Sequence, residues 1–246
     1  MKMYLFILFI LVILVLYLVY YIGLMIIPSS WVGFWTQVIG RCCVKTLQFK
    51  SLNVSNIASF ERVKKSNRPT IIVSNHISLY DGLILSTALG DVCYFVNVDG
   101  MKIVPGIHEV NRKIGSVFID QKSGNSKKIK QYVDNRKSDD NLLVVFPDNM
   151  QPVPSDKYIA PFKTGAFIHG YDILPIVIRY KNYTIDPKYL WYNGETAIHS
   201  LLKVLLDDTC DVEVVILEPI VPRKNENVQD LKNRVHEIMT HTYINC

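Results

Sequence analysis

Six short, nearly continuous apolar runs constrain the fold of this chain most, because each has the length and composition of a buried β-strand. These runs are residues 70–74, 92–98, 116–119, 142–146, 173–180 and 212–217. Helix-like stretches occur among them, at residues 82–89, 126–136, 164–169, 196–206 and 228–241. Strands that alternate with helices and are apolar on both faces predict an α/β domain with a largely parallel sheet flanked by helices.

A long apolar segment precedes the first of these strands. Residues 3–27 contain no charged side chain, and residues 4–21 are almost wholly Leu, Ile, Val, Phe and Tyr. A bilayer core needs about 20 such residues, whereas a cleaved signal has a shorter core that ends at small residues. The sequence therefore predicts an N-terminal transmembrane or membrane-embedded helix, followed by an interfacial helix over residues 31–43. We expect a membrane anchor at residues 1–50 and a globular domain at residues 51–246.

The charge distribution and the cysteine content limit which compartment the globular domain can occupy and which classes of partner it can bind. Lys2 alone precedes the apolar segment, whereas Arg41, Lys45 and Lys50 follow it, so the positive-inside rule predicts a cytosolic globular domain. The net charge of +5 is modest and no recognition motif accompanies it, so nucleic acid is not an expected partner. Five cysteines without a Cys-x-x-Cys pair argue against a disulfide framework and against a zinc site.

A histidine and an aspartate, His76 and Asp81, follow the first predicted strand. Histidine accepts a proton near neutral pH, and a nearby carboxylate can fix its tautomer and stabilise the imidazolium. Five positions apart, the two side chains would not share one helix face, so a turn must bring them together. The pair is typical of a general base and its orienting acid. The alternative is a strand-end histidine beside a helix cap.

Polar residues also follow two other predicted strands. Asp120 comes directly after the third run, and Pro147 and Asp148 come after the fourth. Functional groups of parallel α/β sheets gather on loops at one end of the strands, so these residues are expected to converge on His76 and Asp81. Each aspartate could equally stabilise a turn.

With these positions in order, the chain resembles the glycerolipid acyltransferases typified by 1-acyl-glycerol-3-phosphate acyltransferases. The Asn-His-x-x-x-x-Asp block is matched by Asn75, His76 and Asp81. The second block, Gly-x-x-Phe-Ile-Asp-Arg, is matched by Gly115, Phe118, Ile119 and Asp120, with Gln121 in place of arginine. The third block, Phe-Pro-Glu-Gly-Thr-Arg, is matched by Phe146 and Pro147, with Asp148 in place of glutamate. The segment around Lys163 and the run Leu174-Pro175-Ile176-Val177 are similar to the family's later blocks.

The resemblance implies a membrane-bound acyltransferase domain over residues 51–246 that moves a fatty acyl group from acyl-CoA to the hydroxyl of a lysophospholipid. His76 and Asp81 are its expected catalytic residues, and it needs no metal or resident cofactor because acyl-CoA is a co-substrate. Membrane lipids, acyl-CoA and a lysophospholipid acceptor are the expected partners. The expected substrate-binding residues are Asn75, Ser78, Gly115, Asp120, Gln121, Phe146, Pro147, Asp148 and Lys163.

The chain departs from the family where the acceptor's phosphate is thought to bind. Gln121 and Gln151 occupy the two arginine positions, and glutamine carries no charge to pair with a dianion. These losses favour either an acceptor other than lysophosphatidic acid or phosphate contacts from other residues. They also leave open a catalytically weakened relative that binds lipid or a protein partner, and a transacylase that takes its acyl group from a phospholipid rather than from CoA.

Overall fold

The computed structural model describes residues 51–78, 80–90, 94–98, 115–119, 127–137, 142–148, 159–181 and 211–245, together with residue 112 and scattered positions between residues 11 and 42. The helix expected at residues 196–206 lies outside this part of the chain. Among the described residues, no helix combines the length and the apolarity needed to cross a membrane. The first ten residues of the expected anchor segment also lie outside the description.

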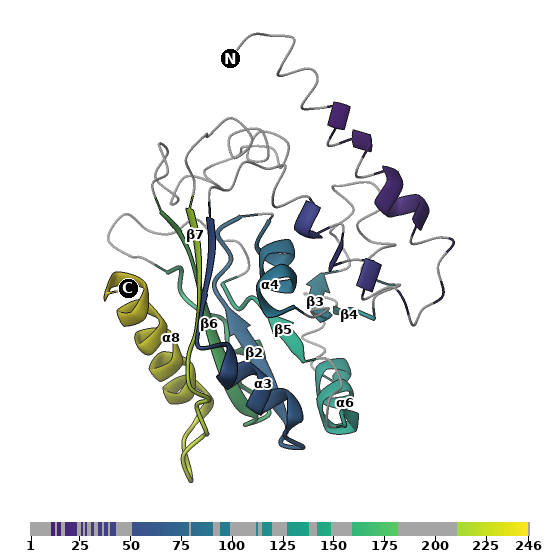
Figure 1. Ribbon diagram of the computed structural model, residues 1–246. Helices are drawn as coiled ribbons and strands as arrows, with labels where there is room; N and C mark the ends of the chain where they lie inside the picture. Colours follow the sequence, from purple (N-terminus) through teal and green to yellow (C-terminus); the bar gives the residue numbers. More distant parts are fainter. Residues whose placement is uncertain are drawn as a thin grey trace.

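Seven described strands form one sheet in the order β1-β7-β6-β2-β5-β3-β4 (Figure 1). Five neighbouring pairs are parallel and one, β6 with β7, is antiparallel. The largely parallel sheet predicted from the apolar runs is therefore confirmed. The strands are β1 (Ser51–Ser55), β2 (Thr70–Ser74), β3 (Tyr94–Val98), β4 (Val117–Ile119), β5 (Leu143–Val145), β6 (Asp172–Lys181) and β7 (Asp211–Ile216).

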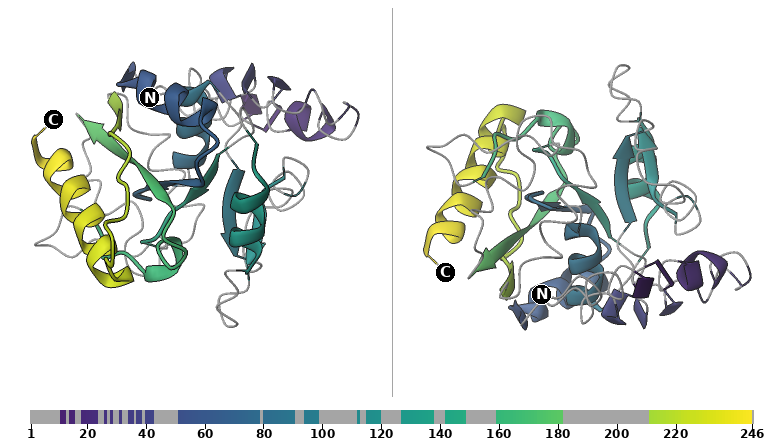
Figure 2. Two further views of the ribbon diagram at one scale, coloured as in Figure 1. Left: turned by 90° about the horizontal axis from the view of Figure 1, so that it is seen from below. Right: turned by 90° about the horizontal axis from the view of Figure 1, so that it is seen from above.

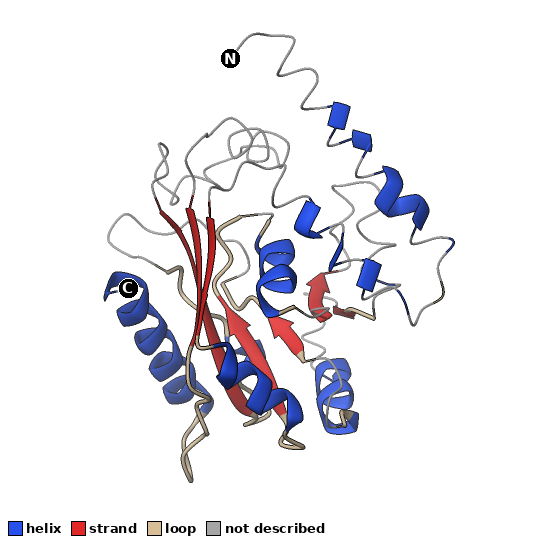
Figure 3. Ribbon diagram, viewed as in Figure 1, coloured by secondary structure: helices blue, strands red, loops and turns tan. Residues whose placement is uncertain are grey.

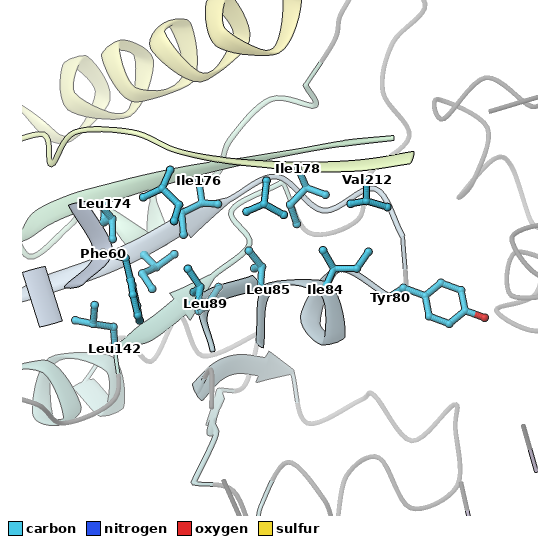
Figure 4. Close-up of a cluster of buried hydrophobic side chains, with 14 of the residues drawn as sticks. Phe60, Tyr80, Ile84, Leu85, Leu89, Leu142, Leu174, Ile176, Ile178 and Val212 are labelled. Carbon is cyan, nitrogen blue, oxygen red and sulfur yellow. The ribbon is translucent and has the colours of Figure 1, made fainter. Parts of the chain in front are cut away.

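Helices cover both faces of this sheet, as the two views of Figure 2 and the colouring of Figure 3 show. They are α3 (Ile57–Lys65), α4 (Asp81–Leu89), α6 (Lys127–Asn135) and α8 (Val228–Asn245). One buried cluster joins α3 and α4 to alternate residues of the central strands, among them Leu174, Ile176 and Ile178 (Figure 4). A second cluster joins α6 and α8 to residues of the opposite parity, such as Ile71 and Val73. Burial on both faces explains why these strands are apolar without alternation.

Strand β6 contains a proline, although it lies in the middle of the sheet between β2 and β7. The carbonyl of Pro175 accepts a hydrogen bond from the Leu217 N–H at 2.9 Å, just past the last residue of β7, Ile216. The N–H and C=O of a strand residue point to the same side, so the N–H that proline lacks falls beyond the end of β7. The proline therefore lies where the regular ladder between β6 and β7 ends, just beyond the pair of Ile176 and Ile216.

The structure departs from the predicted elements in three places. Strand β1 and helix α3 were not predicted, and residues 164–169, predicted to be helical, form only a 3₁₀ turn at Thr164–Ala166. That turn is followed by Gly170, whose φ of 63° lies in the left-handed region and ends any helical continuation. The remaining described elements agree with the predicted ranges to within one or two residues, except for the C-terminus of α8, which extends to Asn245.

An ion pair joins Arg68, two residues before β2, to Asp172, the first residue of β6. Arg68 Nε lies 2.7 Å from Asp172 Oδ2, and Arg68 Nη2 donates to Asp172 Oδ1 at 3.1 Å. Burial raises the pKa of the Asp172 carboxyl above its usual range, and the Arg68 guanidinium opposes that shift only in part. A raised carboxyl pKa contributes stability at acidic pH that is lost as the pH rises through the folded-state value.

We expect Arg68→Gln to lower the free energy of unfolding at neutral pH by about 1 kcal/mol, because Asp172 then stays charged without its partner. The loss should shrink as the pH falls and the carboxyl becomes protonated. Urea unfolding at neutral and at mildly acidic pH measures both values. Arg62→Gln breaks an exposed ion pair with Glu218 and is the matched control, with a smaller expected loss at neutral pH. A loss from Arg68→Gln that does not vary with pH would contradict this account.

Candidate active site

The site lies where β2 and β5 end beside each other. The two strands are parallel, with Val73 opposite Val145, so the residues that follow them emerge at the same edge of the sheet. Asn75 and His76 leave β2 at this edge, and Phe146, Pro147 and Asp148 leave β5. The convergence of these two polar stretches, predicted from their positions after strands, is confirmed.

His76 and Asp81 face each other across a tight turn. His76 Nδ1 lies 2.8 Å from Asp81 Oδ2, the Asp81 side chain is fully buried, and the His76 side chain is 11% exposed. The turn forms because the same Oδ2 accepts the backbone N–H groups of Ile77 at 2.6 Å and Ser78 at 2.8 Å. Both N–H groups come before α4 in the chain, and Asp81 is the first residue of α4. Asp81 therefore stabilises the turn that precedes its own helix and is not an N-cap residue outside the helix.

The second carboxylate oxygen of Asp81 is also bonded. Tyr180, near the end of β6, donates its hydroxyl to Asp81 Oδ1 at 2.5 Å. Asp81 therefore accepts two backbone N–H groups and one hydroxyl besides the imidazole, a pattern that suits an ionised, acceptor-only carboxylate. Against such a partner, His76 carries its proton on Nδ1, which leaves Nε2 as the ring nitrogen that can accept another proton.

Asn75 fixes the start of this turn to the neighbouring strand. Its side-chain amide donates to the Ile178 carbonyl at 2.9 Å and accepts the Ile178 N–H at 2.8 Å. β2 ends at Ser74, opposite Ile176, whereas β6 continues. The amide of Asn75 therefore replaces the next ladder pair, and the chain can turn away without leaving backbone groups of β6 unsatisfied. This contact supports a positioning role for Asn75.

Two residues from the end of β5 hold His76 from the other side. Asp148, which is buried, accepts the backbone N–H of His76 on Oδ2 at 2.7 Å. The Phe146 ring stacks on the imidazole, with ring centroids 4.2 Å apart and an interplanar angle of 22°. Asp148 therefore anchors the histidine backbone while Phe146 sets the plane of its ring.

The other predicted substrate-binding residues differ in how far the structure describes them. The Pro147 carbonyl accepts the Lys163 N–H at 2.8 Å, and the Lys163 residue itself is exposed. Gly115 lies in the turn before β4 with a φ of 91°, a conformation that favours glycine. Its N–H donates to the Arg112 carbonyl at 3.2 Å, a bond within the same turn. Asp120, Gln121 and Gln151 lie outside the described residues.

Sequence reasoning missed Tyr180 and the backbone of Ile178. Both lie about a hundred positions after the motif, at separations of 99 and 103 residues from their partners. The length of the apolar run at residues 173–180, the longest of the six, was the available signal, because a strand longer than its neighbour must extend past it. Within the described part of the chain, His, Cys, Asp and Glu form no group of three or more that could hold a metal ion.

The arrangement can perform general base catalysis. A buried carboxylate with fixed hydrogen bonds orients an imidazole, and the imidazole's other nitrogen can take a proton from a hydroxyl and return it to a leaving group. An imidazole oriented in this way can itself deprotonate a substrate hydroxyl, so direct attack by that hydroxyl needs no covalent enzyme intermediate.

Comparison with known proteins places this geometry in a family. The family model described as acyltransferase matches residues 51–179. The 1-acyl-sn-glycerol-3-phosphate acyltransferase of Saccharomyces cerevisiae is 25% identical over 173 residues, which cover 68% of this chain and 56% of that protein. Lysophospholipid acyltransferase LPEAT1 of Arabidopsis thaliana is 27% identical over 171 residues, which cover 66% of this chain and 41% of that protein. The chain thus spans about half the length of these relatives, or less.

A solved structure has the same fold. The crystal structure of the 1-acyl-sn-glycerophosphate (LPA) acyltransferase PlsC from Thermotoga maritima superposes with a TM-score of 0.59 over 92% of this chain and 94% of that one. The sequence identity is 17%, so this likeness shows the fold alone. The family model covers more than half of the chain and includes His76, Asp81 and Asp148. The family indicated by the sequence blocks is confirmed, and the protein belongs to the acyltransferase family.

Proposed function

We propose that the protein transfers a fatty acyl group from acyl-CoA to the hydroxyl of a lysophospholipid at a membrane surface, with His76 as general base. The observation that carries this proposal is the bond between His76 Nδ1 and Asp81 Oδ2 at 2.8 Å, together with the hydrogen bonds that hold Asp81 in place. A histidine oriented in this way can activate a poor nucleophile such as an alcohol at neutral pH.

The reaction proceeds in two proton transfers. As the acceptor hydroxyl attacks the thioester carbonyl, Nε2 of His76 takes the hydroxyl proton and the new C–O bond forms. The tetrahedral intermediate then collapses, the C–S bond breaks, and His76 gives the proton to the departing CoA thiolate. Asp81 keeps Nδ1 protonated throughout and stabilises the transient imidazolium.

The names of the relatives support a lysophospholipid as the acceptor. They include a 1-acyl-sn-glycerol-3-phosphate acyltransferase and lysophospholipid acyltransferases. Gln121 and Gln151 replace the arginines that the family resemblance leads one to expect. Glutamine can donate hydrogen bonds but carries no positive charge to pair with a phosphate dianion. An acceptor whose headgroup has less negative charge than that dianion is therefore favoured.

A membrane location is supported by the residues near the N-terminus. At described positions before residue 35, large apolar side chains are more than half exposed, namely Leu11, Leu14, Val15, Leu18, Ile26, Trp31 and Phe34. Residues just after these positions contact α4 and its C-terminal end: the Gln37 side chain donates to the carbonyl of Gly90, which follows α4, and a Cβ on Gly40 would lie 3.0 Å from Leu83 Cδ1. Since α4 begins at Asp81, a membrane that took up these side chains would lie near the site.

Acyl transfer by the full chain in isolated membranes tests the proposal. The panel combines two labelled donors, acyl-CoA and a phospholipid, with lysophosphatidic acid, lysophospholipids of zwitterionic headgroup, and neutral glycerides as acceptors. We expect transfer from acyl-CoA to a lysophospholipid, with both the activity and the protein in the membrane pellet after a high-salt wash.

Other outcomes separate the alternatives. Transfer from the phospholipid donor alone would indicate a CoA-independent transacylase. Absence of transfer from either donor, with the protein folded, would contradict the enzymatic proposal and favour a lipid-binding or partner-binding role. Protein and activity in the washed supernatant would contradict the membrane location.

A further inference from the structure

The hydroxyl of Tyr180 lies outside the sequence blocks that define the catalytic pair, one residue past the end of the matched family region. It nevertheless donates to Asp81 Oδ1 at 2.5 Å, and the tyrosine is buried, with 5% of its surface exposed. Asp81 Oδ2, the other oxygen of the same carboxylate, faces His76 Nδ1. The planar carboxylate of Asp81 therefore links the Tyr180 hydroxyl to the His76 imidazole.

The backbone of β6 explains why the hydroxyl reaches this position. Ile178 and Tyr180 are two residues apart on one strand, so their side chains lie on the same face of the sheet, and both belong to the buried cluster beside α4. The Asn75 amide clamps the backbone of Ile178, and Tyr180 reaches Asp81. Strand β6 thus binds the segment on both sides of His76, at Asn75 and at Asp81.

The hydrogen bond from Tyr180 has two physical effects on the pair. It prevents the carboxylate from rotating about its Cβ–Cγ bond, which keeps Oδ2 directed at the imidazole. It also stabilises negative charge on Asp81, so the proton between the two groups stays on His76 Nδ1. Small losses of alignment between catalytic groups lower the rate steeply, because the correct geometry is then populated less often.

We propose that Tyr180 is a positioning residue for the reaction: through Asp81 Oδ1 it holds the carboxylate in the one orientation that keeps His76 ready to accept a substrate proton. This inference rests on the proposed acyl transfer where it concerns kcat. Its effect on the hydrogen bond between Asp81 and His76 can be measured without that activity. Tyr180 does not itself contact the reacting atoms in this account.

Tyr180→Phe tests the inference, because it removes only the hydroxyl and keeps the buried ring. We expect kcat to fall about tenfold while KM for both substrates stays within about twofold, as for a group that acts on the chemical step rather than on binding. The chain offers a matched control in Tyr171→Phe. Tyr171 is also buried, and its hydroxyl donates to Asp134 Oδ1 at 2.6 Å. That variant loses a similar bond away from His76 and should leave kcat unchanged.

A spectroscopic measurement separates failure of this inference from failure of the proposed function. The Nδ1 proton of His76, bonded to a carboxylate, gives a downfield proton NMR signal that does not depend on turnover. In Tyr180→Phe this signal should move or vanish, and in Tyr171→Phe it should stay where it is. If the wild-type protein transfers no acyl group, the proposed function fails while this test still decides on Tyr180.

An unchanged kcat and an unchanged His76 signal in folded Tyr180→Phe would overturn the inference. If that variant does not fold, a ring-fluorinated tyrosine at position 180 replaces it, since it keeps the ring and the hydroxyl but is a stronger hydrogen-bond donor. The His76 Nδ1 signal should then shift with the label at position 180 and not with the label at position 171. Equal responses to the two labels would overturn the inference as well.

Discussion

Replacing His76 with alanine is expected to reduce acyl transfer by about 100- to 10,000-fold, the range that a positioned general base contributes. The substrate hydroxyl then has no group to take its proton as it attacks the thioester. The fold should survive, because the side chain lies at the sheet edge and its main losses are the stacking on Phe146 and one bond to Asp81.

Initial rates with the preferred donor and acceptor, measured beside thermal unfolding, check this expectation. His76→Gln is a useful companion, because it can still donate to Asp81 but cannot shuttle a proton, and it should be equally inactive. His241→Ala removes an exposed histidine from α8 and serves as the control with full activity. Retention of more than about a tenth of the wild-type rate in His76→Ala would exclude His76 as the general base.

Replacing Asp81 is expected to damage both stability and activity. Asp81→Ala leaves the N–H groups of Ile77 and Ser78 and the hydroxyl of Tyr180 without their acceptor in a buried place. Each such buried polar group costs about 1–3 kcal/mol, so we expect a loss of at least about 3 kcal/mol in the free energy of unfolding. The rate should fall about as far as in His76→Ala, since the imidazole loses its orientation.

Asp81→Asn separates the two roles. Its amide oxygen can still accept the two backbone N–H groups, so most of the stability should be retained. It carries no charge to stabilise the imidazolium, so kcat should still fall at least about 100-fold. The double variant His76→Ala with Asp81→Asn should be no slower than His76→Ala alone, because residues that act as a unit have non-additive effects. Additive losses would show that Asp81 acts on the reaction independently of His76.

The parts of the fold that could be predicted are those that apolar runs encode. Buried strands such as β2 and β6 have no polar residue in their central positions, and the predicted ranges agree with the structure. Strand β1 could not be predicted, because three of its five residues are polar and three are exposed. Helix α3 has no acidic residue in its first turn, and its N-cap, Asn56, has a φ of 58° and makes no capping bond with its side chain. Strand β1 thus lacks the apolar run that marks a strand, and α3 has only partial signals, namely an asparagine at its N-cap and the basic residues Arg62, Lys64 and Lys65 in its last turn.

The candidate site divides in the same way. His76 and Asp81 could be recognised because they are close in sequence and their chemistry is complementary. Asp148 could be placed beside them because it follows a parallel strand, although its bond to the His76 backbone rather than to a substrate is a structural finding. Tyr180 could not be recognised, since a tyrosine at the end of an apolar run is ordinary core composition. Its partner is decided by the sheet order, in which β6 lies beside β2.

The length of β6 also has a consequence for biosynthesis. The segment with His76 and Asp81 is synthesised about a hundred residues before the strand that clamps it, at separations of 99 and 103 positions. Contacts between such distant residues form late in folding, because a long loop must close before they are gained. A nascent chain, or one shortened before β6, therefore has the motif but lacks the clamp. The proposed acyl transfer therefore requires a complete central sheet, because the site forms only after β6 has been synthesised and has paired with β2.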